Sequence, residues 1–175
     1  SASRDPDLPD WAKFTPLPLG LAATDKIIAV SPTYSREILT PEYGCGIENY
    51  LKKHSDKVIG ILNGIDEDRW NPAEDEAISH NFSVEQLSDR VKNKLDMQKA
   101  LDFTVDEKIP LLTIVTRLTE QKGVPAILDA LPQLLDRNWQ FALLGSGNPE
   151  LEERVHQLAE DHPDRVACFV RYDDL

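Results

Sequence analysis

Residues 110–123 read Pro-Leu-Leu-Thr-Ile-Val-Thr-Arg-Leu-Thr-Glu-Gln-Lys-Gly, and this stretch, together with the residues up to 170, decides the fold. Its first half, 110–116, is a short apolar run with β-branched side chains, which is typical of a parallel strand buried on both faces. The pattern then continues as a helix at 124–135 interrupted by Pro132, a strand at 141–144, a helix at 149–159 and a strand at 166–170. Apolar strands that alternate with helices predict an α/β fold of parallel sheets with helices on both faces.

Two more short apolar runs lie nearer the N-terminus, at 26–30 and 58–62, and each predicts another strand. Helices are expected at 33–39, because Ser31-Pro32 is a typical helix start, and at 47–54. Four prolines in residues 1–20 (Pro6, Pro9, Pro16 and Pro18) argue against a helix or central strand there.

An acid-rich, proline-containing connection at 65–77 separates the two halves, and we place a domain boundary there. A helix is expected after it, at 83–101, with Val84, Leu87, Val91, Leu95 and Leu101 forming an apolar stripe. The strands at 26–30 and 111–116 are therefore expected in different sheets. The chain opens at Ser1 rather than Met and ends just after a predicted strand, so we expect a segment of a longer protein.

Composition limits the partners. The chain has 175 residues with 31 acidic and 19 basic side chains, a formal net charge of −12, which argues against binding nucleic acid or an anionic membrane. No apolar run reaches the length of a membrane span. Cys45 and Cys168 are far apart and lack a metal-ligand spacing with the four histidines. We therefore expect a cytoplasmic protein that needs neither a metal nor another cofactor.

Candidate ligand-binding residues follow the predicted strands, because open parallel sheets bind ligands beyond the carboxyl ends of their strands. Arg117 and Lys122 lead from the strand at 110–116 into a predicted helix, and this pair suits a diphosphate. The spacing also fits two ordinary surface cations. Gly145-Ser146-Gly147 follows the next strand, but Glu150 stands where a dinucleotide-binding fingerprint needs glycine, which favours a tight turn.

Tyr172 follows the last predicted strand, where an aromatic ring either stacks on a base or packs against neighbours. The acidic pairs lack the further oxygen ligands of a calcium loop. The histidines have no metalloprotease or triad context, and no nucleophile stands out.

Taken together, several stretches resemble the bacterial glycogen synthase and plant starch synthase family, retaining glucosyltransferases that use a nucleoside-diphosphate glucose. The matching segments cover roughly residues 24–174, in the family's order. They are Val-Ser-Pro-Thr-Tyr-Ser-Arg-Glu-Ile at 30–38, Thr-Pro-Glu-Tyr-Gly at 40–44, Gly-Ile-Leu-Asn-Gly-Ile-Asp at 60–66, Trp-Asn-Pro at 70–72, Arg-Leu-Thr-Glu-Gln-Lys-Gly at 117–123, Leu-Gly-Ser-Gly at 144–147 and Tyr-Asp at 172–173.

The resemblance implies a partial two-domain, Rossmann-like glycosyltransferase of the GT-B type. Residues 1–64 would end the N-terminal, acceptor-side domain, 65–108 would form the hinge and connecting helix, and 109–175 would form the first half of the nucleotide-sugar-binding domain.

For the site, the resemblance implies that Arg117 and Lys122 neutralise the departing diphosphate. Gly145 would contribute to substrate binding, Tyr172 would stack on the adenine and Asn63 would lie near the sugar. The implied partners are ADP-glucose and the non-reducing end of an α-1,4-glucan, and the oligomeric state stays open.

Departures from the family pattern limit these expectations. The family's Lys-x-Gly-Gly-Leu loop and its glutamate-bearing Glu-Pro-Cys-Gly-Leu segment are absent from this sequence, and Arg171 stands where the family usually has glycine. We therefore expect the chain alone to be inactive. The alternatives are another two-domain glycosyltransferase with a different donor or acceptor, and a non-catalytic binding fragment. The sequence leaves ADP-glucose and UDP-glucose undistinguished.

Overall fold

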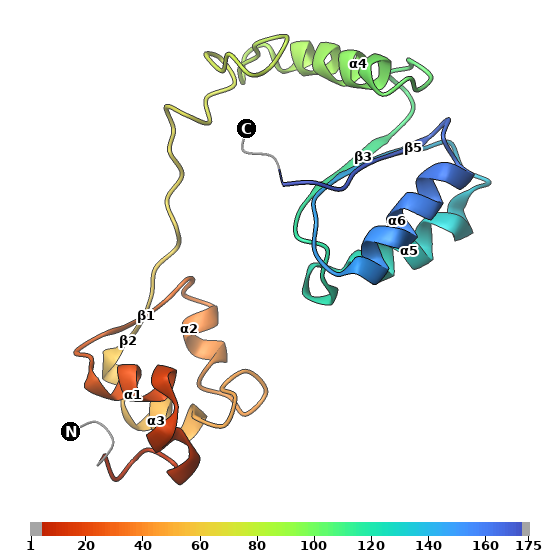
Figure 1. Ribbon diagram of the computed structural model, residues 1–175. Coiled ribbons are helices and arrows are strands. Elements are labelled where there is room, and N and C mark those ends of the chain that lie inside the picture. Colours follow the sequence, from red (N-terminus) through yellow and green to blue (C-terminus); the bar gives the residue numbers. More distant parts are fainter. Residues whose placement is uncertain (1–4, 173–175) are drawn as a thin grey trace. The chain divides into compact units, whose positions relative to one another are not determined.

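The computed structural model describes residues 5–172 and divides the chain into two compact units, one up to Asp66 and one from Glu67 onward (Figure 1). The two units contain separate sheets. β1 pairs with β2 in the first unit, and β3, β4 and β5 form a three-stranded sheet in the second. The expectation that the strands near 26–30 and 111–116 belong to different sheets is therefore confirmed.

The first unit consists of short elements around a small core. In chain order these are the 3-10 turn η2 (Asp10–Phe14), α1 (Pro16–Ala23), β1 (Ile27–Ala29), α2 (Tyr34–Glu37), α3 (Glu48–Lys53), the 3-10 turn η3 (Ser55–Lys57) and β2 (Val58–Gly60). The strands are parallel, with Ile27 opposite Val58 and Ala29 opposite Gly60. The buried core comprises Leu8, Ala12, Ile27, Ile47, Tyr50 and Leu51.

The prolines near the N-terminus do not prevent a helix, and the prediction against one in residues 1–20 was wrong. Pro16 and Pro18 occupy the first turn of α1, where backbone N–H groups have no partner inside the helix in any case. The first backbone hydrogen bond of the helix runs from the Leu19 N–H to the Thr15 carbonyl oxygen, at 3.2 Å. Proline at these two positions therefore removes no hydrogen bond of the helix, so its place within the helix decides whether it disrupts the helix.

The second unit is a parallel α/β layer. Its elements are the 3-10 turn η4 (Leu87–Asp89), α4 (Arg90–Ala100), β3 (Leu111–Val115), the 3-10 turn η5 (Glu120–Lys122), α5 (Val124–Ala130), the 3-10 turn η6 (Leu131–Leu134), β4 (Gln140–Leu144), α6 (Pro149–Asp161) and β5 (Val166–Phe169). The strand order is β3-β4-β5, with Leu111 opposite Gln140 and Phe141 opposite Val166. These strands closely follow the predicted ones.

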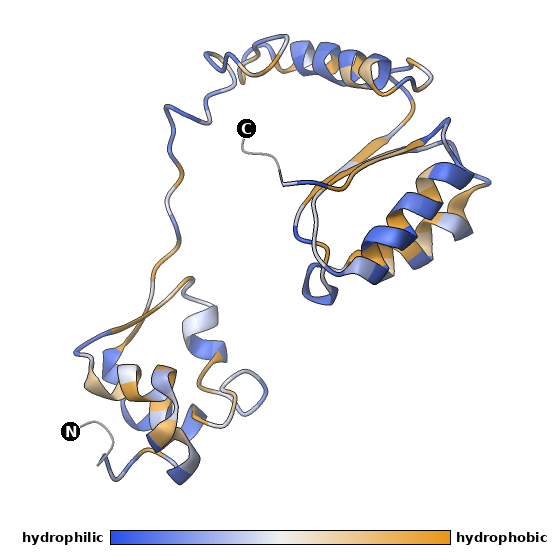
Figure 2. Cartoon of the chain, viewed as in Figure 1, coloured by the Kyte–Doolittle hydropathy of each residue, from blue (hydrophilic) through white to orange (hydrophobic). Residues whose placement is uncertain are grey.

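Helices α5 and α6 lie side by side on one face of this sheet (Figure 1). The core between them and the strands is buried and apolar; it comprises Leu118, Val124, Leu128, Leu131, Trp139, Phe141, Leu143, Leu151, Val155, Leu158 and Val166. Figure 2 shows the strands as largely hydrophobic, whereas α6 alternates hydrophobic and hydrophilic residues. This is the pattern of a helix that buries one stripe and exposes the other.

Helix α4 departs from its prediction, because it begins at Arg90 and not at Ser83. The Ser83 hydroxyl donates to the Glu85 carboxylate instead of capping a helix, and Val84 of the expected stripe is 89% exposed. The buried residue of α4 is Gln98. Its side chain bonds the Gln140 side chain of β4 at 2.7 Å and both polar backbone groups of Asp106 at 3.0 Å, so a polar network fixes α4 to the sheet.

Candidate functional site

The loops after β3 and β4 are joined beyond the ends of their strands. The Thr116 N–H donates to the Leu144 carbonyl oxygen at 3.1 Å, the Leu118 N–H to that of Ser146 at 2.9 Å, and the Asn148 N–H to that of Leu118 at 2.8 Å. Leu118 also forms an isolated parallel bridge with Gly147, and its side chain is fully buried. The position of the loop after β3 is therefore set by backbone pairing and one apolar anchor.

Only glycine fits at positions 145 and 147 of this contact, because there is no space for a Cβ atom. A Cβ atom on Gly145 would lie 1.8 Å from the Thr116 carbonyl oxygen, and one on Gly147 would lie 2.4 Å from that of Leu118. The Gly145 N–H in turn donates to the Phe169 carbonyl oxygen of β5 at 3.1 Å. The Gly145-Ser146-Gly147 turn is thus where the carboxyl ends of all three strands come together, and the prediction of a tight turn agrees with this geometry.

Arg117 and Lys122 both lie exposed on the loop after β3. Neither side chain makes a hydrogen bond or ion pair with any residue in the described range 5–172. Lys122 ends the turn η5, and Gly123 follows with φ 72°, so the left-handed residue separates Lys122 from α5. The cations therefore do not lead straight into the helix as expected, whereas the interruption expected at Pro132 agrees with the structure, because α5 ends at Ala130 and continues as η6.

The start of α6 satisfies its own N–H groups. Asn148 caps the helix by accepting from the Glu150 N–H at 2.8 Å, and the Glu152 carboxylate accepts from the Gly147 N–H at 2.7 Å. Two acidic side chains already complement the helix dipole there. The cations of this edge consequently lie outside the start of α6: Arg117 and Lys122 on the loop after β3, and Arg171 after β5.

The remaining predicted site residues lie at different places. Tyr172 is 80% exposed and follows β5, the strand next to β4, so it belongs to the same carboxyl edge as Gly145. Asn63 is exposed in the segment after β2 and belongs to the first unit. In the second unit, the loop that carries Arg117 and Lys122 thus lies against the turn that begins at Gly145. Tyr172 follows the neighbouring strand, β5.

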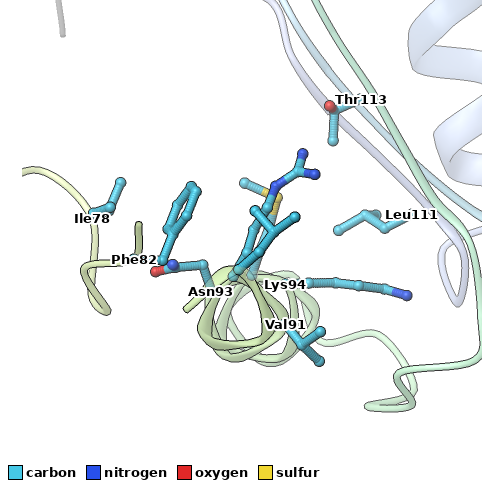
Figure 3. Close-up of a pocket in the computed structure, with 10 residues that line it drawn as sticks. Ile78, Phe82, Val91, Asn93, Lys94, Leu111 and Thr113 are labelled. Carbon is cyan, nitrogen blue, oxygen red and sulfur yellow. The ribbon is translucent and has the colours of Figure 1, made fainter. Parts of the chain in front are cut away.

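Sequence reasoning missed the cavities on the sheet face that α5 and α6 leave open. One of about 290 Å³ is lined by Leu144, Phe169 and Arg171 near the carboxyl edge and by Met97 and Leu101 nearby. A larger one, about 500 Å³, lies between α4, β3 and the segment before α4. Figure 3 shows Ile78 and Phe82 on one side of it, Leu111 and Thr113 on the other, and residues of α4 between them.

Comparison with known proteins identifies the relatives of this chain. A family model described as the starch synthase catalytic domain matches residues 2–53. The glycogen synthase of Aromatoleum aromaticum is 44% identical over 164 residues, which are 94% of this chain and 33% of that protein. The glycogen synthase of Serratia proteamaculans is 42% identical over 93% of this chain and 34% of its own length. The chain spans about a third of the curated relatives that it matches.

Solved structures extend the likeness to the fold. The catalytic domain of starch synthase IV from Arabidopsis thaliana, bound to ADP and acarbose, matches with a TM-score of 0.81 and 36% identity, over 90% of this chain and 33% of that one. A glycosyltransferase from Rickettsia africae matches with a TM-score of 0.53 at 21% identity, over 86% of this chain and 34% of that one, and supports the fold alone. The parallel α/β fold is accordingly that of a GT-B glycosyltransferase.

Within that class, the chain belongs to the glycogen synthase and starch synthase family, of which it covers a segment. The resemblance drawn from the sequence motifs is confirmed. Among the described residues, no helix is both long and apolar enough to cross a membrane.

Proposed function

We propose that the whole protein transfers glucose from ADP-glucose to the non-reducing end of an α-1,4-glucan, and that this chain contributes the junction of its two domains. In this proposal, residues 1–64 end the acceptor-side domain, 65–108 form the hinge and connecting helix, and 109–175 begin the nucleotide-sugar-binding domain. The plant starch synthase that matches at 36% identity is described as bound to ADP and acarbose, which supports both a nucleotide and a glucan-like ligand.

The observation that carries the proposal is a pair of exposed cations on a fixed loop, neither of which forms an ion pair with a residue that the structure describes. Arg117 and Lys122 flank the buried anchor Leu118, so their backbone is held while their side chains extend into solvent. Negative charge grows on the departing diphosphate as the bond to glucose breaks. Two cations that are already in position stabilise that charge more in the transition state than in the ground state.

The other site residues have supporting roles in this proposal. Gly145 lets the β4 backbone approach the loop after β3 closely, which positions the turn that faces the donor. The exposed ring of Tyr172 stacks on the adenine, and Asn63 from the first unit approaches the sugar. In this proposal the whole protein works in the cytoplasm, on ADP-glucose and a glucan, without a nucleic-acid or membrane partner.

The test is made in the whole enzyme, where both substrates are bound. Arg117→Ala and Lys122→Ala should each lower kcat by about 30- to 1000-fold, the equivalent of about 2–4 kcal/mol of transition-state stabilisation. The KM for glucan should stay nearly constant. Lys122→Arg should rescue the rate only in part, because a planar guanidinium does not reproduce a compact ammonium.

Lys108→Ala is the matched control, because Lys108 is an exposed cation of the same unit placed before β3 and away from the loop. It should keep both kcat and KM. If Arg117→Ala or Lys122→Ala keeps kcat and weakens only glucan binding, the cations belong to the acceptor side and the assignment is wrong.

A second measurement addresses donor and catalytic competence. The 175-residue chain by itself should give no glucose transfer above a Lys122→Ala control, because it lacks both the Lys-x-Gly-Gly-Leu and the glutamate-bearing motifs. The whole enzyme should prefer ADP-glucose to UDP-glucose in kcat/KM. A preference for another nucleotide sugar would favour the alternative of a different two-domain glycosyltransferase.

A further inference from the structure

The segment that follows β2 holds the only Asn-Gly pair of the sequence, Asn63-Gly64. This segment belongs to neither a helix nor a strand, and both residues of the pair are exposed (Figure 1). Leu62 and Ile65, on either side of the pair, are 69% and 68% exposed, so the flanking residues are open to solvent as well. The Asn63 amide and the Gly64 backbone are therefore both in contact with water.

Neither the Asn63 amide nor the Gly64 N–H is engaged by the fold. The Ile61 N–H still donates to the Ala29 carbonyl oxygen of β1, at 2.9 Å. Two and three residues later, the Asn63 side chain and the Gly64 N–H make no hydrogen bond with any residue in the described range 5–172. A Cβ atom built on Gly64 would have no atom within 4 Å, so no neighbouring group packs against this backbone.

An asparagine side chain and the backbone nitrogen after it can react with each other. When the Gly64 nitrogen attacks the Asn63 Cγ atom, the new N–Cγ bond closes a succinimide ring. The Cγ–Nδ2 bond breaks, and ammonia leaves with the proton of the Gly64 N–H. The reaction is intramolecular and needs only rotations within two adjacent residues. Glycine favours it, because no Cβ atom hinders the approach and because its backbone reaches conformations that other residues avoid.

We propose that Asn63 is a site of spontaneous deamidation. Water then opens the succinimide at one of its two carbonyl carbons. Opening at Cγ gives aspartate, whereas opening at the backbone carbonyl carbon gives isoaspartate, in which the peptide bond to Gly64 runs through the side chain. Water is the only co-reactant, and nothing is oxidised or reduced. Either product adds one negative charge to a chain whose net charge is −12.

Other asparagines of the chain lack one of these conditions. The Asn81 amide donates to two backbone carbonyl oxygens, at 3.2 and 2.9 Å. Asn138 is exposed and lies outside the helices and strands, as Asn63 does, but the residue after it is Trp139, which is 5% exposed. A bulky side chain that is buried in the core crowds the neighbouring nitrogen and restricts its movement. Asn138 is therefore a matched internal control.

The modification has a consequence for activity, which rests on the proposed function because there Asn63 approaches the sugar. An amide both donates and accepts hydrogen bonds, whereas a carboxylate only accepts them. Deamidation would remove the donor and add a negative charge beside a negatively charged nucleotide sugar. The whole enzyme should therefore lose activity in step with the conversion of Asn63.

The experiment incubates the folded 175-residue chain in neutral buffer and follows its proteolytic peptides by tandem mass spectrometry. The peptide that contains Asn63 should gain about 1 Da, as an amide becomes a carboxyl group, and should contain both aspartate and isoaspartate. The peptide that contains Asn138 should keep its mass. The rate should lie within a few-fold of that in a synthetic peptide of residues 60–67, because the fold engages neither reacting group.

Two variants test the chemistry. Gly64→Val should slow the mass gain at least about 5-fold, because a β-branched residue crowds the attacking nitrogen and restricts the backbone. The space around Gly64 is open, so the valine side chain meets no other part of the fold. Asn63→Gln keeps an amide whose longer side chain must close a larger ring, and it should show no mass gain over the same period. Circular dichroism establishes that each variant is folded.

Two results would overturn the proposal: a mass gain at Asn63 no greater than at Asn138, and a gain that Gly64→Val leaves unchanged. A separate measurement follows glucose transfer by the whole enzyme during the same incubation. Activity that stays constant while Asn63 converts would overturn the placement of Asn63 near the sugar, whereas the mass gain would still establish the modification. Failure of the proposed role and failure of the modification are therefore distinguishable.

Discussion

Gly145→Ala adds a single methyl group at the point where the carboxyl ends of β3, β4 and β5 are joined. An ideal Cβ atom at this position lies 1.8 Å from the Thr116 carbonyl oxygen. Close carbon–oxygen contacts in proteins are about 3.3 Å, so the two backbones would have to separate by about 1.5 Å. Because the obstructing atom is backbone and not the end of a flexible side chain, a rotamer change cannot relieve the clash.

The size of the effect depends on the contacts which that separation disturbs. Overpacking of this kind costs about 1–3 kcal/mol. Two hydrogen bonds flank the contact, from Thr116 N–H to Leu144 and from Gly145 N–H to Phe169, both at 3.1 Å. Weakening them removes about 0.5–1.5 kcal/mol each. We expect Gly145→Ala to lower the free energy of unfolding of the second unit by about 3 kcal/mol.

The assay must report on the second unit alone, because a chain with two units does not unfold in one two-state step. Trp139 is 5% exposed and belongs to the core beneath the sheet. In a Trp11→Phe, Trp70→Phe background it is the remaining tryptophan. With a urea dependence of about 1–3 kcal/mol per molar, a loss of 3 kcal/mol lowers the midpoint by about 1–3 M.

Two other glycines provide controls. Gly123 has φ +72° but no atom within 4 Å of a Cβ built on it, so Gly123→Ala meets backbone strain without a clash and should lose about 1–2 kcal/mol. Gly64 lies in the first unit with open space around it, and Gly64→Ala should leave the Trp139 transition unchanged. If Gly145→Ala loses no more stability than Gly123→Ala, the close approach of β4 to Thr116 does not exist and the reasoning fails.

Three further predictions concern other parts of the chain. Gln98→Leu strands the Asp106 N–H and the Gln140 side-chain oxygen, so it should destabilise the second unit by about 3 kcal/mol in the same urea assay; a near-neutral result would contradict the polar network. The hydrogen bond from Lys53, and to a smaller extent the contact with His54, hold the pKa of the Asp7 carboxyl below its ordinary value of 3.8. The stability that Asp7 contributes is therefore present above pH 3.8 and is lost as the pH falls through the lower, folded-state pKa. Asp7→Asn should flatten that acid-side loss, measured by urea titrations followed at Trp11. Burial, with the charge of Glu160, raises the pKa of the Cys168 thiol above 9.0, so a thiol reagent should label Cys45→Ser more slowly than Cys168→Ser, and equal rates would refute this.

The strands of the second unit could be predicted because their signal is local. A parallel strand covered by helices is an apolar run bounded by polar or glycine residues, and the predicted runs at 110–116, 141–144 and 166–170 correspond to β3, β4 and β5. The loops that follow them could be predicted for the same reason. Chain order alone places Arg117, Lys122, Gly145 and Tyr172 after strands of one parallel sheet, and such strands share a carboxyl edge.

The missed features depend on contacts between distant residues. Gln98 reads as a surface position of an amphipathic helix, but it is fully buried because Gln140, 42 residues later, supplies its hydrogen-bond partner. The start of α4 was predicted too early for a related reason. Val84 has the spacing of a residue in a core stripe, but its side chain is exposed. The contact between the Asp7 carboxylate and the His54 ring gives no spacing signal either, because 47 residues separate the two.

In the loop after β3, a short sequence fixes the backbone while its charged side chains keep their rotamer freedom. In Arg117-Leu118-Thr119, the central side chain is fully buried and its backbone pairs on both sides with the Gly145–Asn148 turn. The flanking arginine is exposed, and Lys122 follows one turn later. The backbone of this loop is therefore already ordered when the protein folds, because Leu118 is buried and because the glycines of the turn allow the two backbones to approach closely. Arg117 and Lys122 have only rotamer freedom left to lose when an anion binds. A sequence that replaced Leu118 with a polar residue would keep both charges and lose their common position, so the apolar residue between the cations matters to the proposed site as much as the cations do.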